Sequence, residues 1–183
     1  MKPAVFLDRD GVLIENRPDY VRNWHDVAFY PQALAAMSRI SRLPHSIILV
    51  TNQSAVGRGI ISLDRAWAIN QRIVEVISEA GGRIDRVYMC PHAPWDGCGC
   101  RKPKPGLFLQ AASELSLDLN QSLMIGDALT DLVAAKAAGV PMVALVRTGR
   151  GDEQEQLPVA ENLQPLAVYP DLSDALETIF LSQ

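Results

Sequence analysis

Short apolar runs alternate along the chain with longer segments whose apolar residues recur every three or four positions. The short runs predict buried strands at 4–7, 46–50, 84–89, 122–125 and 142–146. The longer segments predict helices at about 31–43, 62–80, 107–115, 130–138 and 172–181. Strands buried on both faces read as continuous apolar runs, and their alternation with helices is typical of a parallel sheet covered on both sides. The pattern therefore predicts a doubly wound α/β fold.

Local signals support these boundaries. Pro31 suits a first helical turn, Ser62 can cap a helix, and glycines follow the helices that end near residues 80 and 138. The segments without periodicity are predicted to be loops, and they are 15–26, 90–106 and 147–165. We find no internal repeat, low-complexity tract or linker, which favours one unit over several.

Composition adds limits to this picture. A chain of 183 residues with 48% hydrophobic content can bury one sizeable core, so we expect a single domain over 1–183 without a large cap domain. The net charge of −4 argues against nucleic acid as a partner. No apolar stretch reaches membrane-spanning length and no secretory signal pattern is present, so we expect a cytoplasmic protein that does not bind membranes.

Two carboxylates follow the first predicted strand. Asp8 and Asp10 lie two positions apart, so in an extended segment both side chains point to the same side, and Gly11 allows a sharp turn after them. Ligands of open α/β sheets bind outside such strand ends, where one carboxylate can attack a substrate while the other handles a proton. The alternative is a pair of solvated turn residues.

Polar residues also follow the second predicted strand. Thr51, Asn52, Gln53 and Ser54 come directly after it, and Arg58 lies between two glycines a few residues later. Hydroxyl, amide and backbone N–H groups at a strand end are suited to bind phosphate oxygens. Ordinary polar turns have the same composition, so this signal is weak by itself.

A stiff basic segment lies further along the chain. Prolines flank Arg101, Lys102 and Lys104 and restrict the backbone there. A lysine can neutralise a phosphoryl oxygen and an arginine can bind a second anionic group with two hydrogen bonds. We assign the first role to Lys102 and the second to Arg101, and we expect Lys104 to be solvated.

The fourth predicted strand also ends in carboxylates. Asp127 should emerge at the same edge of the sheet as Asp8 and Asp10, and Asp131 lies one helical turn further along. Several carboxylates at one edge repel each other unless a cation joins them, and Mg²⁺ is the natural hard cation. Asp131 has the alternative of a first-turn acid favoured by the helix dipole.

All three cysteines lie in one window with a histidine. Cys90, His92, Cys98 and Cys100 supply four donors of the kind that a structural Zn²⁺ requires. A disulfide is the competing interpretation, but the odd number of cysteines, the expected cytoplasmic location and the histidine favour zinc. With the metal bound, this loop would be rigid and would position Lys102.

Taken in order, these motifs resemble those of the haloacid dehalogenase-like phosphohydrolases, over residues 4–146. The resemblance implies a Rossmann-like domain in which Asp8 is the nucleophile and Asp10 the general acid and base. It implies further that Thr51 and Lys102 hold the phosphoryl group. The magnesium ligands would be Asp8, the main-chain carbonyl of Asp10, and Asp127, with Asp131 behind them.

The predicted zinc ligands at residues 90–100, followed by Arg101 and Lys102, resemble the pattern of a smaller branch of this superfamily. That branch contains the D-glycero-D-manno-heptose 1,7-bisphosphate 7-phosphatases and the histidinol-phosphate phosphatases. In the heptose enzymes the residue matching Arg101 takes part in substrate recognition, and the loop after Asp10 closes over the sugar, which in this chain corresponds to about Asn16 to Tyr20. This chain has Ala128 where several heptose relatives have a polar substrate-contacting residue, so the exact sugar stays open.

We therefore expect a magnesium-dependent phosphomonoesterase with a structural zinc. The expected substrate is a small phosphorylated metabolite, heptose 1,7-bisphosphate first and histidinol phosphate second, and the expected assembly is a monomer or small homo-oligomer. Asn52, Gln53, Ser54, Arg58 and Arg101 are the candidate substrate-binding residues. The alternative from another class is a non-catalytic interaction module stapled by zinc, which would need none of the phosphate motifs.

Overall fold

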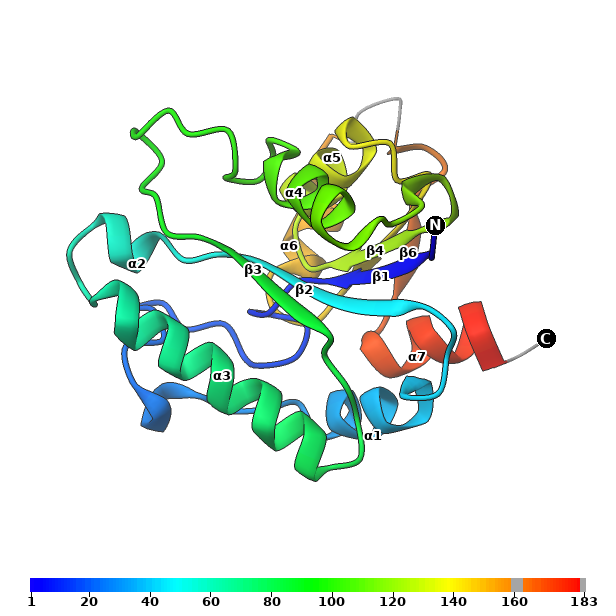
Figure 1. The fold of residues 1–183 in the computed structure, drawn as a ribbon, viewed down its shortest axis with the longest axis horizontal. Helices are drawn as coiled ribbons and strands as arrows, with labels where there is room; N and C mark the ends of the chain where they lie inside the picture. The colour runs from blue at the N-terminus through cyan, green and yellow to red at the C-terminus, as the bar shows by residue number, and fades with distance from the viewer. Residues whose placement is uncertain (159–162, 182–183) are drawn as a thin grey trace.

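The computed structural model describes residues 1–158 and 163–181. Within them the chain forms a six-stranded sheet in the order β3-β2-β1-β4-β5-β6, and all neighbouring strands are parallel (Figure 1). The strands are β1 (Ala4–Leu7), β2 (Ser46–Asn52), β3 (Arg86–Cys90), β4 (Leu123–Gly126), β5 (Met142–Val146) and β6 (Ala167–Tyr169). The expected doubly wound parallel fold is confirmed.

Helices cover both faces of the sheet (Figure 1). They are α1 (Pro31–Ile40), α2 (Ser54–Gly57), α3 (Leu63–Glu79), α4 (Gly106–Leu115), α5 (Leu129–Ala137), α6 (Gly151–Glu155) and α7 (Leu172–Leu176), which continues as a π-helical segment, Glu177–Leu181. Short 3₁₀ turns lie at Trp24–Asp26 and Leu119–Gln121. No helix in the described part of the chain is long and apolar enough to cross a membrane.

Alternate residues of the central strand build the two halves of the core. Val5 and Leu7 pack with α1, α3 and α7, whereas Ala4 and Phe6 pack on the opposite face with α4 and α5. The Phe6 ring, for example, lies 4.9 Å from the ring of Phe108 in α4. Because β1 is fully buried on both faces, its sequence is apolar at every position.

Several elements differ from the sequence prediction: α2 was not predicted, β3 begins at residue 86 instead of 84, and α1 ends at residue 40 instead of 43. The segment 147–165 was expected to be a loop, but it contains α6, whose polar sequence has no apolar periodicity to reveal it; residues 159–162 of that segment lie outside the described residues. The edge strand β6 was missed because it is three residues long and half-exposed. β2 extends two residues beyond its apolar run, so Thr51 and Asn52 belong to the strand.

The sheet order creates a switch point between β1 and β4. From β1 the chain proceeds to β2 and β3 on one side, and β4 then begins the other half of the sheet. Loops leaving the carboxyl ends of these two neighbouring strands turn in opposite directions and leave a crevice between them, where open α/β sheets bind ligands. Asp8 and Asp127 directly follow these two strands.

Candidate active site

A cavity of about 520 Å³ lies at the carboxyl ends of the central strands. Most of the predicted site residues line it, namely Asp8, Asp10, Asn52, Gln53, Ser54, Arg101, Lys102 and Asp131. Its wall also contains residues that the sequence analysis did not single out, including Arg9, Asn16, Arg17, Thr130 and Arg150. Polar side chains from regions far apart in the sequence therefore meet at this one edge of the sheet.

Lys102 is the buried cation of the cavity. Its ammonium lies 2.8 Å from Asp8 Oδ1, 2.8 Å from Asp131 Oδ1 and 2.9 Å from the carbonyl oxygen of Val50, so all three of its protons have acceptors. Burial works to lower the pKa of Lys102, but the charges of Asp131 and Asp8 outweigh it and the pKa is raised. Lys102 is therefore a fixed positive charge in contact with Asp8.

Burial acts more strongly on Asp8. It raises the pKa of Asp8 to about 7, assisted by Asp131 and Asp127 and opposed by the attraction of Lys102. Only 5% of Asp8 is exposed, at the cavity wall. The carboxylate thus lacks full charge compensation within the described residues, which is the state expected of a group that meets a cationic ligand.

Asn52 fixes the main chain of Lys102. Its side-chain amide donates to the Lys102 carbonyl oxygen at 3.1 Å and its oxygen accepts from the Lys102 N–H at 3.1 Å. The end of β2 therefore determines where the lysine ammonium enters the cavity. The amide serves the lysine main chain, a contact that the sequence prediction of a substrate-binding Asn52 did not include.

Asp10 belongs to a separate hydrogen-bond network. The guanidinium of Arg9 donates to both oxygens of Asp10, at 3.0 and 3.1 Å, and the side-chain amide of Gln53 donates to the same carboxylate at 2.9 Å. Gln53 also donates to the Thr51 hydroxyl at 2.8 Å, and Arg9 donates to the buried Asn70 at 2.8 Å. Arg9 is only 1% exposed, so its charge is neutralised inside the fold by Asp10. This network fixes the orientation of the Asp10 carboxylate.

Asp127 is fully buried at the end of β4 and is held by three groups. Its Oδ2 accepts from the Asn16 amide at 2.6 Å and from the Arg150 main-chain N–H at 2.9 Å, and the Arg150 guanidinium lies 3.3 Å from Oδ1. Burial and Asp131 raise the pKa of Asp127, while Arg150 opposes this. Oxygens of Asp127, Asp131 and Asp8 lie within 4.8 Å of one another, which defines the carboxylate cluster.

The backbone approaches Asp127 closely at two glycines. A β-carbon at Gly11 would lie 2.1 Å from Asp127 Oδ2, and one at Gly149 would lie 2.4 Å from the same atom. Both glycines have positive φ, at +83° and +64°. The Thr148 hydroxyl donates to the Gly11 carbonyl oxygen and joins the two segments. These positions have room for hydrogen only, so the carboxylate is enclosed by main chain.

Besides the fully buried Asp127, two residues predicted for this site do not line the cavity. Arg58 lies with its guanidinium 4.7 Å from the centre of the exposed Trp95 ring, and the structure does not bring it to the cavity. Thr51 is fully buried behind the wall and accepts from Gln53. Arg101, by contrast, reaches the cavity, and its guanidinium contacts only the His92 carbonyl oxygen, at 3.4 Å, among the residues described.

Asp131 has two contacts within the fold. One oxygen accepts from the Ala128 N–H, which caps α5, and the other pairs with Lys102. The interpretation as a first-turn acid therefore holds, but it does not describe the whole contact set. Asp131 also holds the lysine that contacts Asp8.

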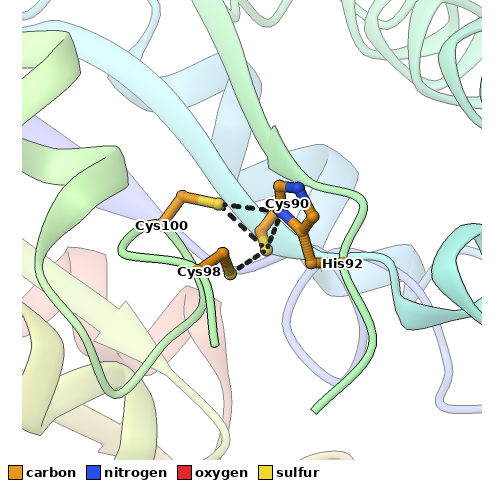
Figure 2. A group of neighbouring side chains, drawn as sticks. All are labelled: Cys90, His92, Cys98 and Cys100. Atoms are coloured by element: carbon orange, nitrogen blue, oxygen red, sulfur yellow. Dashed lines mark hydrogen bonds between the residues drawn. The ribbon is translucent and has the colours of Figure 1, made fainter. Parts of the chain in front are cut away.

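A second cluster of ligand-type side chains lies in the loop after β3. Figure 2 shows the sulfurs of Cys90, Cys98 and Cys100 converging with the His92 ring, and the four donor atoms lie within 4.8 Å of one another. The Cys90 sulfur lies 3.7 Å from that of Cys98 and 3.2 Å from that of Cys100. A disulfide needs about 2.05 Å, so these cysteines are free, whereas sulfurs around a tetrahedral zinc at about 2.3 Å lie roughly 3.8 Å apart. The donor set fits zinc.

The chain is similar in sequence to several known proteins. A family model described as HAD-hydrolase-like matches residues 99–175. A D-glycero-β-D-manno-heptose-1,7-bisphosphate 7-phosphatase of Vibrio cholerae is 40% identical over 91% of this chain and 89% of its own length. The enzyme of that name from Pseudomonas aeruginosa is 36% identical over 94% of both chains.

The chain belongs to the haloacid dehalogenase-like hydrolases. Its fold matches the crystal structure of the D,D-heptose 1,7-bisphosphate phosphatase of B. bronchiseptica, complexed with magnesium and phosphate, with a TM-score of 0.88. That match covers 97% of each chain at 35% identity. The resemblance inferred from the motifs of the sequence is confirmed.

Membership in this family implies a divalent metal ion, and the residues present fit one. Asp8, Asp127 and Asp131 offer hard oxygen donors that are buried and close together. The raised pKa of Asp8 and of Asp127 has burial as its first cause, and the mutual repulsion of the carboxylates adds to it. A divalent cation with oxygen ligands relieves both effects.

Sequence reasoning missed Arg9 and Arg150, and it placed Asn16 only in the loop that the resemblance implies closes over the sugar. A signal existed for Arg9, because it lies between Asp8 and Asp10 and a cation buried there needs an acceptor. No local signal marks Asn16 or Arg150. Both reach Asp127 only through the folding of loops that are distant from it in the sequence.

Proposed function

We propose that this protein is a magnesium-dependent phosphatase that removes the 7-phosphate of D-glycero-β-D-manno-heptose 1,7-bisphosphate. The supporting observation is the convergence of Asp8, Asp10 and Lys102 on one cavity in a chain with 40% identity to a phosphatase named for that reaction. A cavity of about 520 Å³ has room for a heptose with two phosphates. A non-catalytic role would leave these groups without purpose.

In the first step an oxygen of Asp8 attacks phosphorus and forms an aspartyl phosphate. The bond from phosphorus to the sugar oxygen breaks, and that leaving oxygen takes a proton from Asp10, which acts as the general acid. Arg9 and Gln53 hold the Asp10 carboxyl group in place. The Lys102 ammonium, already 2.8 Å from Asp8, stabilises the negative charge on the transferring group.

In the second step water replaces the enzyme oxygen. The Asp10 carboxylate accepts a proton from the water as the water oxygen bonds to phosphorus, and the bond between phosphorus and Asp8 breaks. Inorganic phosphate leaves, and both carboxyl groups return to their starting states. Thr51 supports this step from behind the wall, because its hydroxyl accepts from the Gln53 amide that orients Asp10.

The magnesium ligands in this proposal are the carboxylates of Asp8 and Asp127 and the main-chain carbonyl oxygen of Asp10. Asp131 lies behind them and holds Lys102. When bound, the ion neutralises negative charge on the phosphoryl oxygens. Asn16 and Arg150 keep Asp127 oriented by their hydrogen bonds to Oδ2.

The loop after β3 holds a structural Zn²⁺ through Cys90, His92, Cys98 and Cys100. The loop leads directly into Arg101 and Lys102, so the metal fixes the segment that supplies the buried cation. Ser54 and Arg101 line the cavity and contact the substrate outside the reacting phosphate. A cytoplasmic location agrees with three free cysteines gathered at a zinc site.

A turnover screen tests the proposal. Purified protein with Mg²⁺ is assayed for phosphate release from the β- and α-anomers of heptose 1,7-bisphosphate, from histidinol phosphate and from p-nitrophenyl phosphate. The expected order of kcat/KM places the β-bisphosphate first. A higher kcat/KM for histidinol phosphate would contradict the assigned substrate while leaving the phosphatase chemistry intact.

A further inference from the structure

The two oxygens of Asp127 are held unequally. Oδ2 accepts short hydrogen bonds from the Asn16 amide, at 2.6 Å, and from the main-chain N–H of Arg150, at 2.9 Å. Oδ1 accepts, within the described parts of the chain, only from the Arg150 guanidinium at 3.3 Å. The carboxylate therefore stays fixed through Oδ2 whatever the Arg150 side chain does, and Oδ1 is the oxygen available to another partner.

The Arg150 guanidinium is held loosely. Its contacts to Asp127 are 3.3 and 3.4 Å long, beyond the usual 2.7–2.9 Å of a charge-assisted hydrogen bond, and its side chain is 54% exposed at the cavity wall. The carboxylates close enough to act on it are Asp127, Asp131 and Asp8. The charge of Arg150 is thus balanced by the carboxylate cluster and by no other acidic group that the structure describes nearby.

A bound metal ion would change the net charge of the carboxylate cluster. When all three carboxylates of the cluster are ionised, the positive charges of Lys102 and Arg150 leave a net charge of one negative. A divalent cation at the same oxygens reverses this to one positive charge. The guanidinium then competes with the ion for Oδ1. It is also repelled by the ion, because two positive charges so close to one oxygen repel each other. The Arg150 guanidinium then no longer has a carboxylate partner, and its positive charge is unpaired at the wall of a cavity that accepts phosphate.

We propose that Arg150 is a positioning residue that couples metal loading to substrate binding. Its guanidinium occupies Oδ1 of Asp127 in the metal-free protein, and it turns into the cavity to bind the non-reacting phosphate of the substrate when the metal takes that oxygen. The main-chain N–H of Arg150 keeps its hydrogen bond to Oδ2 in both states. The part that concerns the second phosphate rests on the proposed function, whereas the competition for Oδ1 does not.

The competition is tested by calorimetric titration of the purified protein with Mg²⁺ alone. Arg150→Met removes the charged head and keeps the main-chain N–H, so Mg²⁺ should bind about two- to fivefold more tightly than to the wild type, the effect of losing one partly exposed ion pair. Arg147→Met is the matched control, because Arg147 is exposed nearby and pairs with Glu155 instead. Equal or weaker Mg²⁺ binding to Arg150→Met, or the same gain in the control, overturns the proposal.

The transfer to the second phosphate is tested by kinetics at saturating Mg²⁺. Arg150→Met should raise KM for heptose 1,7-bisphosphate about tenfold with kcat little changed, while KM for p-nitrophenyl phosphate, which has no second phosphate, should not rise. Equal increases for both substrates overturn the transfer. If the wild type fails to hydrolyse the bisphosphate, the proposed function is wrong, and the calorimetric result still decides whether Arg150 competes with the metal.

Discussion

The two clusters of metal-type ligands differ in what holds them together. In the carboxylate cluster, Lys102 and Arg150 supply positive charge, and the backbone closes on Asp127 at Gly149. In the cluster of Cys90, His92, Cys98 and Cys100, the ligand atoms contact one another, and no cationic side chain contacts a sulfur in the described residues. The first cluster has its own counter-charges, whereas the part of the chain that the structure describes supplies none to the second.

The main chain encloses the carboxylate cluster more tightly than it encloses the loop of residues 90–100. A β-carbon at Gly99, in the thiol loop, would meet nothing within 4 Å, whereas one at Gly149 would meet Asp127 at 2.4 Å. Burial raises the pKa of the Cys90 thiol, and no positive side chain offsets it. We infer that the carboxylate cluster is preorganised before a metal ion binds, and that the loop of residues 90–100 would depend on the proposed zinc for its order.

The largest expected effect belongs to the nucleophile. Asp8→Asn should lower kcat by at least roughly a thousandfold, because an amide is a poor nucleophile and a poor metal ligand. The fold should remain, since Lys102 keeps Asp131 and the Val50 carbonyl oxygen as acceptors. Steady-state kinetics with circular dichroism checks both parts. Asp152→Asn, an exposed acid outside the cavity, should behave as the wild type, and near-native activity of Asp8→Asn would refute the assigned nucleophile.

Removing each metal separately tests the comparison itself. A chelator of zinc should lower the free energy of unfolding by about 3 kcal/mol, or roughly 6–12 °C in the midpoint, and should expose residues 90–100 to protease. Removal of Mg²⁺ alone should abolish activity and shift the midpoint much less, because Lys102 and Arg150 remain. Elemental analysis should give about one zinc per chain. If losing magnesium shifted the unfolding midpoint more than losing zinc, the carboxylate cluster would be the one that depends on its metal for stability.

Arg101 connects the two clusters, since it follows Cys100 and lines the cavity. Arg101→Ala should lower kcat/KM on the preferred substrate, mainly by raising KM. The corresponding loss of transition-state stabilisation should be about 1.5–3 kcal/mol, the usual contribution of a hydrogen bond to a charged group. Hydrolysis of an aryl phosphate should suffer much less. Arg58→Ala should have little effect, because the Arg58 guanidinium lies over Trp95. Equal losses on both substrates would mean that Arg101 does not distinguish them.

Two alanine substitutions give the smallest and most local test. Gly149→Ala places a β-carbon against Asp127 at positive φ and should cost about 1–3 kcal/mol of stability and weaken Mg²⁺ binding. Gly99→Ala meets open space and should stay within about 0.5 kcal/mol of the wild type. Chemical denaturation and calorimetry measure both effects. Similar small changes in the two variants would show that the carboxylate cluster is less tightly enclosed than its geometry implies.

The sequence predicted what local pattern encodes. The strand at 4–7 was placed without error because it is apolar at every position. Asp8 and Asp127 were found because they follow strand ends, and Lys102 because prolines restrict the basic segment that contains it. The contacts of Asn16 and Arg150 to Asp127 were not predicted, because they join loops that lie more than 20 residues from Asp127 in sequence. The position of Arg58 outside the cavity depends on its stacking with Trp95, which no spacing rule contains.

The place of β1 in the sheet has a consequence for synthesis of the protein. β1 is made first and can pair with β2 as soon as residues 46–52 emerge, but its other edge is covered only by β4, at residues 123–126. During the interval the ribosome carries a partial sheet whose open edge is an apolar strand, the kind of edge that pairs with other chains. A chain that stops before residue 123 would therefore be prone to aggregate, and it would also lack Asp127.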